Sequence, residues 1–138
     1  MFNVLATINW LSVLLAFIVY FLLGGLWYVV LFAKPYKVSL GKANETLNNQ
    51  SALFMVGPGL CVLVTILATT VLLYALRIDS VGGALQLALV VGLGYLVANT
   101  TNIAINPNIP RPLLYSAITS AYHLVGITCT CLVLVALK

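Results

Sequence analysis

Residues 1–33 read MFNVLATINWLSVLLAFIVYFLLGGLWYVVLFA, a stretch without a single aspartate, glutamate, lysine or arginine. About 20 predominantly apolar helical residues are enough to cross the hydrocarbon core of a bilayer, which is ~30 Å thick. The stretch also lacks the basic start and the short apolar core of a cleavable signal sequence. It therefore predicts a helix that spans the membrane and is retained.

Three further uncharged runs follow at residues 46–76, 80–110 and 112–137. In the whole chain of 138 residues, 63% are hydrophobic and only 6% are charged, whereas about 25% of residues are charged in soluble domains. The sequence predicts one domain, residues 1–138, with an all-α fold: an integral membrane bundle of four transmembrane helices in up-down-up-down order. The helices are expected at about residues 9–32, 51–76, 81–105 and 112–137.

Prolines and turn residues separate these helices. Lys34 precedes Pro35, which disfavours a helical conformation at Lys34 and predicts the end of the first helix there. Pro58 lies inside the second helix and predicts a kink or local unwinding. Residues 77–80 predict a tight turn between the second and third helices. Pro112 suits the first position of the fourth helix, where its missing N–H is not needed.

The loops predict the orientation in the membrane. An even number of crossings puts both termini on one side and residues 34–50, with the Pro-rich turn before Pro112, on the other. The second side carries four basic residues, Lys34, Lys37, Lys42 and Arg111, and the terminal side carries Arg77 and Lys138. Because cytoplasmic loops are richer in Lys and Arg, residues 34–50 are expected in the cytoplasm of a bacterial cell and both termini outside its inner (plasma) membrane. The scattered basic residues predict contact with membrane lipid and no nucleic-acid partner.

The fourth helix has a polar face. Ser116, Thr119, Ser120 and His123 fall at i, i+3, i+4 and i+7, a spacing that lines one side of a helix. His123 lies 11 residues beyond Pro112, about 16 Å into the membrane. An ionisable residue at such a depth is a functional-site hypothesis by default.

The third helix has two stripes of its own. Tyr95, Asn99, Asn102 and Asn106 fall at α-helical spacing, and this stripe is expected to face the polar side of the fourth helix. The second stripe consists of the small residues Ala84, Ala88 and Gly92 at i, i+4 and i+8, which favour close approach to a neighbouring helix.

The sequence argues against catalysis and against a metal or another cofactor. The carboxylates are Glu45 and Asp79, in loops expected on opposite sides of the membrane. No acid–base partner for His123 is therefore expected at its depth, and no catalytic residue is predicted. One histidine with the cysteines Cys129 and Cys131, which point to different sides of a helix, does not form a metal site.

The chain resembles a family of small four-helix membrane proteins, mainly bacterial, known as domain of unknown function 1761. The resemblance rests on Asn9-Trp10 at the start of the first helix and on Gly24-Gly25-Leu26-Trp27-Tyr28 at its end, followed by Phe32, Lys34 and Tyr36, and on Tyr122-His123 in the fourth helix. It implies four helices and no particular activity. It also implies that Asn9, Trp27, Tyr28 and His123 form a set.

The function expected from these residues is binding or transport of a small molecule or a proton through an intramembrane polar pocket, without enzymatic activity. The candidate residues are His123, Asn99, Asn102, Tyr122, Trp27, Tyr28, Ser120 and Thr119. The alternative is a structural or accessory subunit of a membrane complex, in which these side chains only connect helices through hydrogen bonds. Because four helices cover little surface among themselves, a homo-oligomer is also expected.

Overall fold

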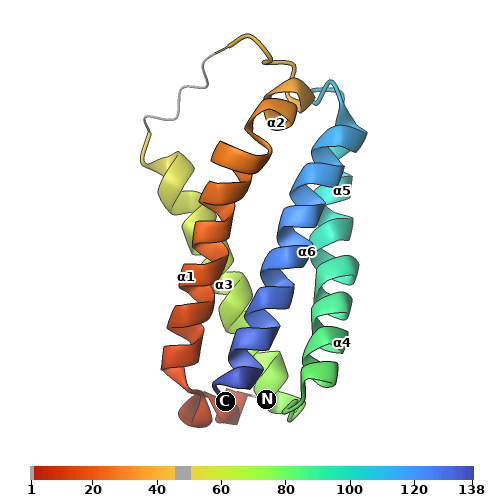
Figure 1. Ribbon diagram of the computed structural model, residues 1–138. Helices are drawn as coiled ribbons and strands as arrows, with labels where there is room; N and C mark the ends of the chain where they lie inside the picture. The colour runs from red at the N-terminus through yellow and green to blue at the C-terminus, as the bar shows by residue number, and fades with distance from the viewer. Residues whose placement is uncertain (1, 46–50) are drawn as a thin grey trace.

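The computed structural model describes residues 2–45 and 51–138 (Figure 1). The elements are η1 (Phe2–Thr7), α1 (Trp10–Gly25), η2 (Leu26–Leu31), α2 (Ala33–Ser39), α3 (Leu53–Ala75), α4 (Val81–Val91), η3 (Gly92–Val97), α5 (Ala98–Ala104) and α6 (Pro112–Ala136). The first is a 3-10 helix, and η2 and η3 are π-helical turns. The described part of the chain contains no strand, so the all-α prediction is confirmed.

Four of the described helical segments are long and apolar enough to cross a membrane: α1 with η2, α3, the continuous segment α4–η3–α5, and α6. They are 22, 23, 24 and 25 residues long, so the shortest reaches about 33 Å at 1.5 Å per residue. Both termini lie at one end of the bundle, and α2 lies at the other end (Figure 1). The prediction of a bundle of four membrane-spanning helices is therefore confirmed.

The last helix, α6, lies in the middle of the bundle. It packs against α1 on one side and against the α4–η3–α5 segment on the other (Figure 1). In an apolar stretch of 18 residues of α6, 44% of the residues are buried, against 17% in the corresponding stretch of α1 with η2. The small residues Ala84 and Ala88 of α4 are fully or almost fully buried, and a Cβ atom on Gly92 would come within 2.7 Å of Leu124 of α6. The expected close approach through small residues thus occurs between α4–η3 and α6.

The contact between α1 and α6 depends on one glycine. The Tyr20 side chain of α1 is 1% exposed, and its ring lies where a Cβ atom on Gly126 of α6 would be. Any larger residue at position 126 would overlap this ring. The missing side chain of Gly126 therefore allows a large aromatic residue to be buried between the two helices.

Hydrogen bonds join the two chain ends at the terminal end of the bundle. The Asn9 side chain caps α1 by accepting a hydrogen bond from the Leu11 N–H at 3.1 Å, and its Nδ2 donates to the carbonyl oxygen of Leu137 at 2.6 Å. The Asn9 backbone N–H donates to the hydroxyl of Tyr74 at 3.0 Å. Asn9 therefore connects α1, α3 and the end of α6, at the opposite end of α1 from Trp27.

Two expectations about prolines are corrected. Lys34 is helical, because Phe32 (φ −118°, ψ 18°) ends the first span and α2 begins at Ala33. Pro35 then lies in the first turn of α2, where its missing N–H leaves no carbonyl without a partner. The local unwinding expected at Pro58 does not occur, since α3 is helical from Leu53 to Ala75; the kink stays a prediction.

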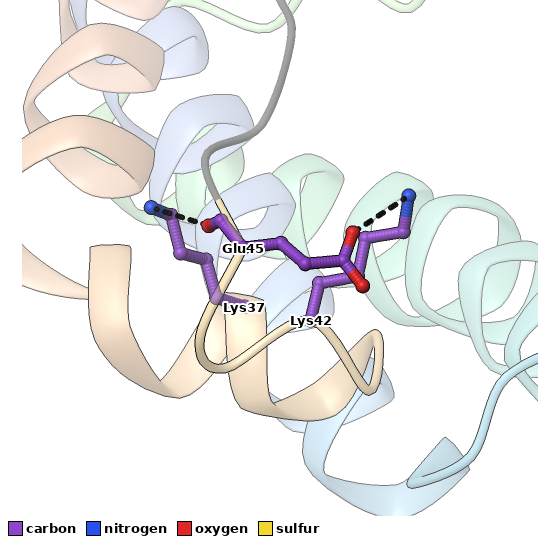
Figure 2. Close-up of polar contacts among 3 residues, drawn as sticks. All are labelled: Lys37, Lys42 and Glu45. Carbon is purple, nitrogen blue, oxygen red and sulfur yellow. Dashed lines mark hydrogen bonds and ion pairs between the residues drawn. The ribbon is translucent and has the colours of Figure 1, made fainter.

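Polar contacts join the segments at the other end of the bundle. Figure 2 shows Glu45 between two lysines: Lys37 Nζ donates to its backbone carbonyl at 3.4 Å, and Lys42 Nζ lies 3.8 Å from its carboxylate. The Lys42 and Glu45 side chains are exposed, so their ion pair contributes at most about 1 kcal/mol. The Arg111 N–H also donates to the carbonyl of Ser39 at 3.3 Å, which joins α2 to the Pro-rich turn.

We expect Gly126→Ala to destabilise the protein. The new methyl group would overlap the Tyr20 ring, and overpacking of this kind costs about 1–3 kcal/mol. Thermal unfolding in detergent, followed by circular dichroism, measures the effect. Gly82→Ala is the matched control, because a Cβ atom there meets nothing within 4 Å. Equal melting temperatures for the two variants would contradict the proposed role of Gly126.

Candidate functional site

The centre of the candidate site is a contact between Tyr20 and His123. The Tyr20 hydroxyl oxygen lies 2.9 Å from His123 Nδ1 and 3.4 Å from the backbone carbonyl oxygen of the same histidine. The imidazole is half-buried. Its second nitrogen, Nε2, makes no hydrogen bond to any residue that the structure describes. One ring nitrogen is thus held by the protein, and the other is available to a ligand.

Aromatic rings surround this contact. Tyr122 lies next to His123 on α6, with ring centroids 4.9 Å apart, and meets Tyr28 at 5.2 Å and Trp27 at 6.3 Å. The indole N–H of Trp27 donates to the backbone carbonyl of Ile118 at 3.0 Å. The structure therefore brings together four of the candidate residues: Trp27, Tyr28, Tyr122 and His123.

The row of rings continues to the end of the bundle where α2 lies (Figure 1). Tyr28 contacts Tyr36 of α2 with centroids 4.8 Å apart, and Tyr36 contacts Tyr115 of α6 at 5.9 Å. Burial, with a smaller contribution from the neighbouring Tyr115, raises the pKa of Tyr36 to about 12. Its hydroxyl therefore stays protonated at neutral pH. The row provides hydroxyl groups at intervals from the middle of the span to its end.

Two hydroxyls of α6 are buried without a hydrogen bond. Thr119 and Ser120 are each 8% exposed, and neither hydroxyl oxygen has a hydrogen-bond partner among the described residues. The Tyr28 hydroxyl is a polar neighbour of Thr119, but the two groups make no hydrogen bond of acceptable geometry. Most buried polar groups in proteins are hydrogen-bonded, so these two hydroxyls are candidates for contact with a bound molecule. Ser116, on the same face, instead shares a 2.7 Å hydrogen bond with Thr101 of α5.

The expectation that Asn99 and Asn102 face the polar side of α6 is wrong. Both side chains are exposed on the outer surface of the bundle. They make no hydrogen bond to any described residue. Thr100 and Ala104 are buried instead, with exposed fractions of 8% and 0%. The two asparagines therefore do not belong to the site around His123.

The π-helical turn η3 explains this error. An uninterrupted α-helix makes three turns in about 11 residues, so it would place Asn99 nearly in line with the buried Ala88. A π-helical turn has i→i+5 hydrogen bonds and so adds one residue to the helix. The inward position expected at Asn99 therefore moves one residue along the chain, to Thr100, and Ala104 is buried one turn later. The sequence alone gave no sign of this turn.

Sequence reasoning also missed Tyr20. Tyrosines in membrane helices concentrate at the two interfaces, where the hydroxyl meets water. Tyr20 lies ten residues after Trp10, about 15 Å along the helix, far from either interface. A hydroxyl at this depth needs a partner within the protein, and this requirement could have identified it.

The described residues hold no group of three or more histidine, cysteine, aspartate or glutamate side chains close enough to bind a metal ion. Glu45 follows α2 and Asp79 precedes α4, so the two carboxylates lie at opposite ends of the bundle. The hydrogen bond that the structure shows at His123 is the one with Tyr20, and an imidazole nitrogen can donate or accept a hydrogen bond.

Tyr20→Phe tests the central contact. We expect the variant to lose about 1 kcal/mol of stability, the usual net contribution of one hydrogen bond. Tyr122→Phe is the matched control, because the Tyr122 hydroxyl makes no hydrogen bond to any described residue. Chemical unfolding of both variants in the same detergent measures the difference. A Tyr20→Phe protein as stable as the control would show that this hydrogen bond contributes nothing.

Among the comparisons with known proteins, one finds a match, and it is to a family model. No curated protein and no solved structure matches the chain. A family model matches residues 11–135, which include Gly24 to Tyr28 and the Tyr122-His123 pair, whereas Asn9 and Trp10 precede the matched range. The match covers nearly the whole chain, and it confirms the resemblance noted from the sequence. The chain belongs to the family described as Protein of unknown function (DUF1761).

Proposed function

We propose that this membrane protein binds a proton reversibly at His123 and so responds to pH or transfers protons within the bilayer. The observation that carries the proposal is the position of the Tyr20 hydroxyl, within reach of both Nδ1 and the carbonyl oxygen of His123. This geometry supplies hydrogen bonds to the neutral and to the charged imidazole.

The neutral imidazole has one acceptor nitrogen and one donor nitrogen. The shorter Tyr20 contact is the one to Nδ1, which favours donation of the hydroxyl hydrogen to that nitrogen and leaves the ring hydrogen on Nε2. Protonation makes both nitrogens donors. Nδ1–H then donates to the Tyr20 oxygen, and the hydroxyl hydrogen turns toward the carbonyl oxygen of His123, 3.4 Å away. Only the hydroxyl rotates, so the helices keep their positions.

The groups that face His123 are neutral. They are Tyr20 on α1 and Tyr122 on α6, whose rings contact the imidazole, and Tyr28 on η2 contacts Tyr122 in turn. The carboxylates lie at the ends of the bundle. A charged imidazole at this depth is costly without further polar contacts. Thr119 and Ser120, with their unpartnered hydroxyls one turn away, support the proposal because they can solvate the charge directly or through a small polar ligand.

Nitrogen NMR can follow His123 without an assignment problem, because it is the single histidine of the chain. We propose to label it with ¹⁵N-histidine, with a purification tag free of histidine, and to record spectra in lipid bilayers from about pH 4 to pH 9. We expect the Nε2–H tautomer of the neutral ring at the basic end and a doubly protonated ring on acidification. Tyr20→Phe should mix the two neutral tautomers. An imidazole that never protonates would contradict the proposal.

Proton transfer is a separate measurement. Vesicles containing the protein and an entrapped pH-sensitive dye should dissipate an imposed pH gradient faster than vesicles with His123→Asn protein. Reversible protonation in the spectra with equal dissipation rates would restrict the function to sensing.

The second candidate is a structural or accessory subunit of a membrane complex. The Trp27 contact with the Ile118 carbonyl and the hydrogen bond between Thr101 and Ser116 favour it, because both join helical segments. In this case His123→Asn would change the stability of the bundle and leave no pH-dependent property to lose.

We further propose a bacterial inner-membrane location with α2 and the Pro-rich turn in the cytoplasm. Support comes from four basic residues at that end against two at the terminal end.

A C-terminal alkaline phosphatase fusion should therefore be active, and a C-terminal green fluorescent protein fusion should not fluoresce. N-terminal fusions should agree, because both termini lie at one end of the bundle. A fluorescent C-terminal fusion would reverse the orientation.

A further inference from the structure

The outer face of the α4–η3–α5 segment has a composition that does not suit lipid. Three residues with unused hydrogen-bonding groups, Tyr95, Asn99 and Asn102, are exposed there, and Tyr95 is 69% exposed. None of the three makes a hydrogen bond to a described residue. The segment packs mainly on α6 and lies at the edge of the bundle (Figure 1). This set of residues is called the outer stripe below.

The outer stripe reaches well into the membrane. Asn99 lies five residues and Tyr95 nine residues before Ala104, the last residue of the span. At 1.5 Å per residue these positions are roughly 8 Å and 14 Å inside the end of the helix. Asparagine side chains at such positions in membrane helices usually form hydrogen bonds across a helix–helix contact.

Small residues leave room for such a contact at the same place. Gly94 and Ala98, at i and i+4, are exposed between the polar side chains, and a Cβ atom on Gly94 would meet nothing within 4 Å. Pairs of small residues at this spacing let the backbones of two membrane helices approach closely. The π-helical segment η3 creates this surface, because it changes the direction in which the side chains point. The small residues before it, Ala84 and Ala88, face α6, whereas Gly94 and Ala98 face away from α6.

We infer that the outer stripe is the contact surface between two copies of this chain, arranged parallel about a two-fold axis along the membrane normal. In a two-fold dimer each residue near the axis meets its own copy, so Asn99 and Asn102 of one protomer lie at the depth of the same residues in the other. An amide both donates and accepts hydrogen bonds, and a tyrosine hydroxyl does too. The stripe is therefore complementary to itself. This inference is independent of proton binding at His123.

Cysteine cross-linking in bilayers tests the contact. In a Cys61→Ser background, which removes the exposed native thiol, Ala98→Cys should form a disulfide-linked dimer under mild oxidation. Ala121→Cys, at an exposed alanine of α6, is the matched control and should stay monomeric. A cross-link at position 121 and none at position 98 would overturn the inference.

Dissociation constants in bilayers provide the second test, measured by energy transfer between labelled copies over a range of protein-to-lipid ratios. The double variant Asn99→Leu/Asn102→Leu should dimerise roughly tenfold more weakly than the wild type, because several interhelical hydrogen bonds are lost. Ala98→Ile should have a similar effect and Ala121→Ile none. A wild-type protein that stays monomeric at every ratio would overturn the inference. This would also be the result if a different protein covered the outer stripe.

Discussion

The burial of Tyr20 between α1 and α6 is the interaction on which the rest of the structure depends. Its ring occupies the space left by Gly126, and its hydroxyl meets His123. Lipid offers no hydrogen bonds, so a polar group at this depth must find its partner in the protein. One side chain thus sets the spacing of two helices and orients the histidine. The structural and the proposed functional roles of Tyr20 have the same physical origin.

The two π-helical turns decide what each helix presents to its neighbours. In the first span, η2 carries Trp27 and Tyr28, which contact Tyr122 next to the histidine. In the third span, η3 moves the inward positions by one residue, so that Thr100 faces inward and Asn99 outward. π-helical turns are frequent at functional sites. Here they separate two polar regions: one inside the bundle around His123, and the outer stripe on its surface.

These two regions correspond to different roles for polar side chains in a membrane. Around His123 the groups are enclosed by rings, and some hydroxyls remain unpartnered, which suits exchange of a proton or a small ligand. On the outer stripe the groups face outward, which suits another helix. Membership of a family of unknown function does not choose between the two roles. The geometry allows both, because no residue of the stripe contacts the histidine.

The sequence by itself determined the number of spans, the turn at residues 77–80, the common side of the termini and the polar face of α6, because these depend on local hydrophobicity, proline positions and helical spacing. The resemblance to the family also grouped Trp27 and Tyr28 with His123, but it included Asn9, which lies at the terminal end of the bundle. Only the tertiary structure decided that Tyr20 is the partner of the histidine and that Asn99 and Asn102 face outward. A partner 103 residues away along the chain leaves no local pattern. A single residue added in a π-helical turn rotates everything after it by about 100°, the angle per residue of an α-helix.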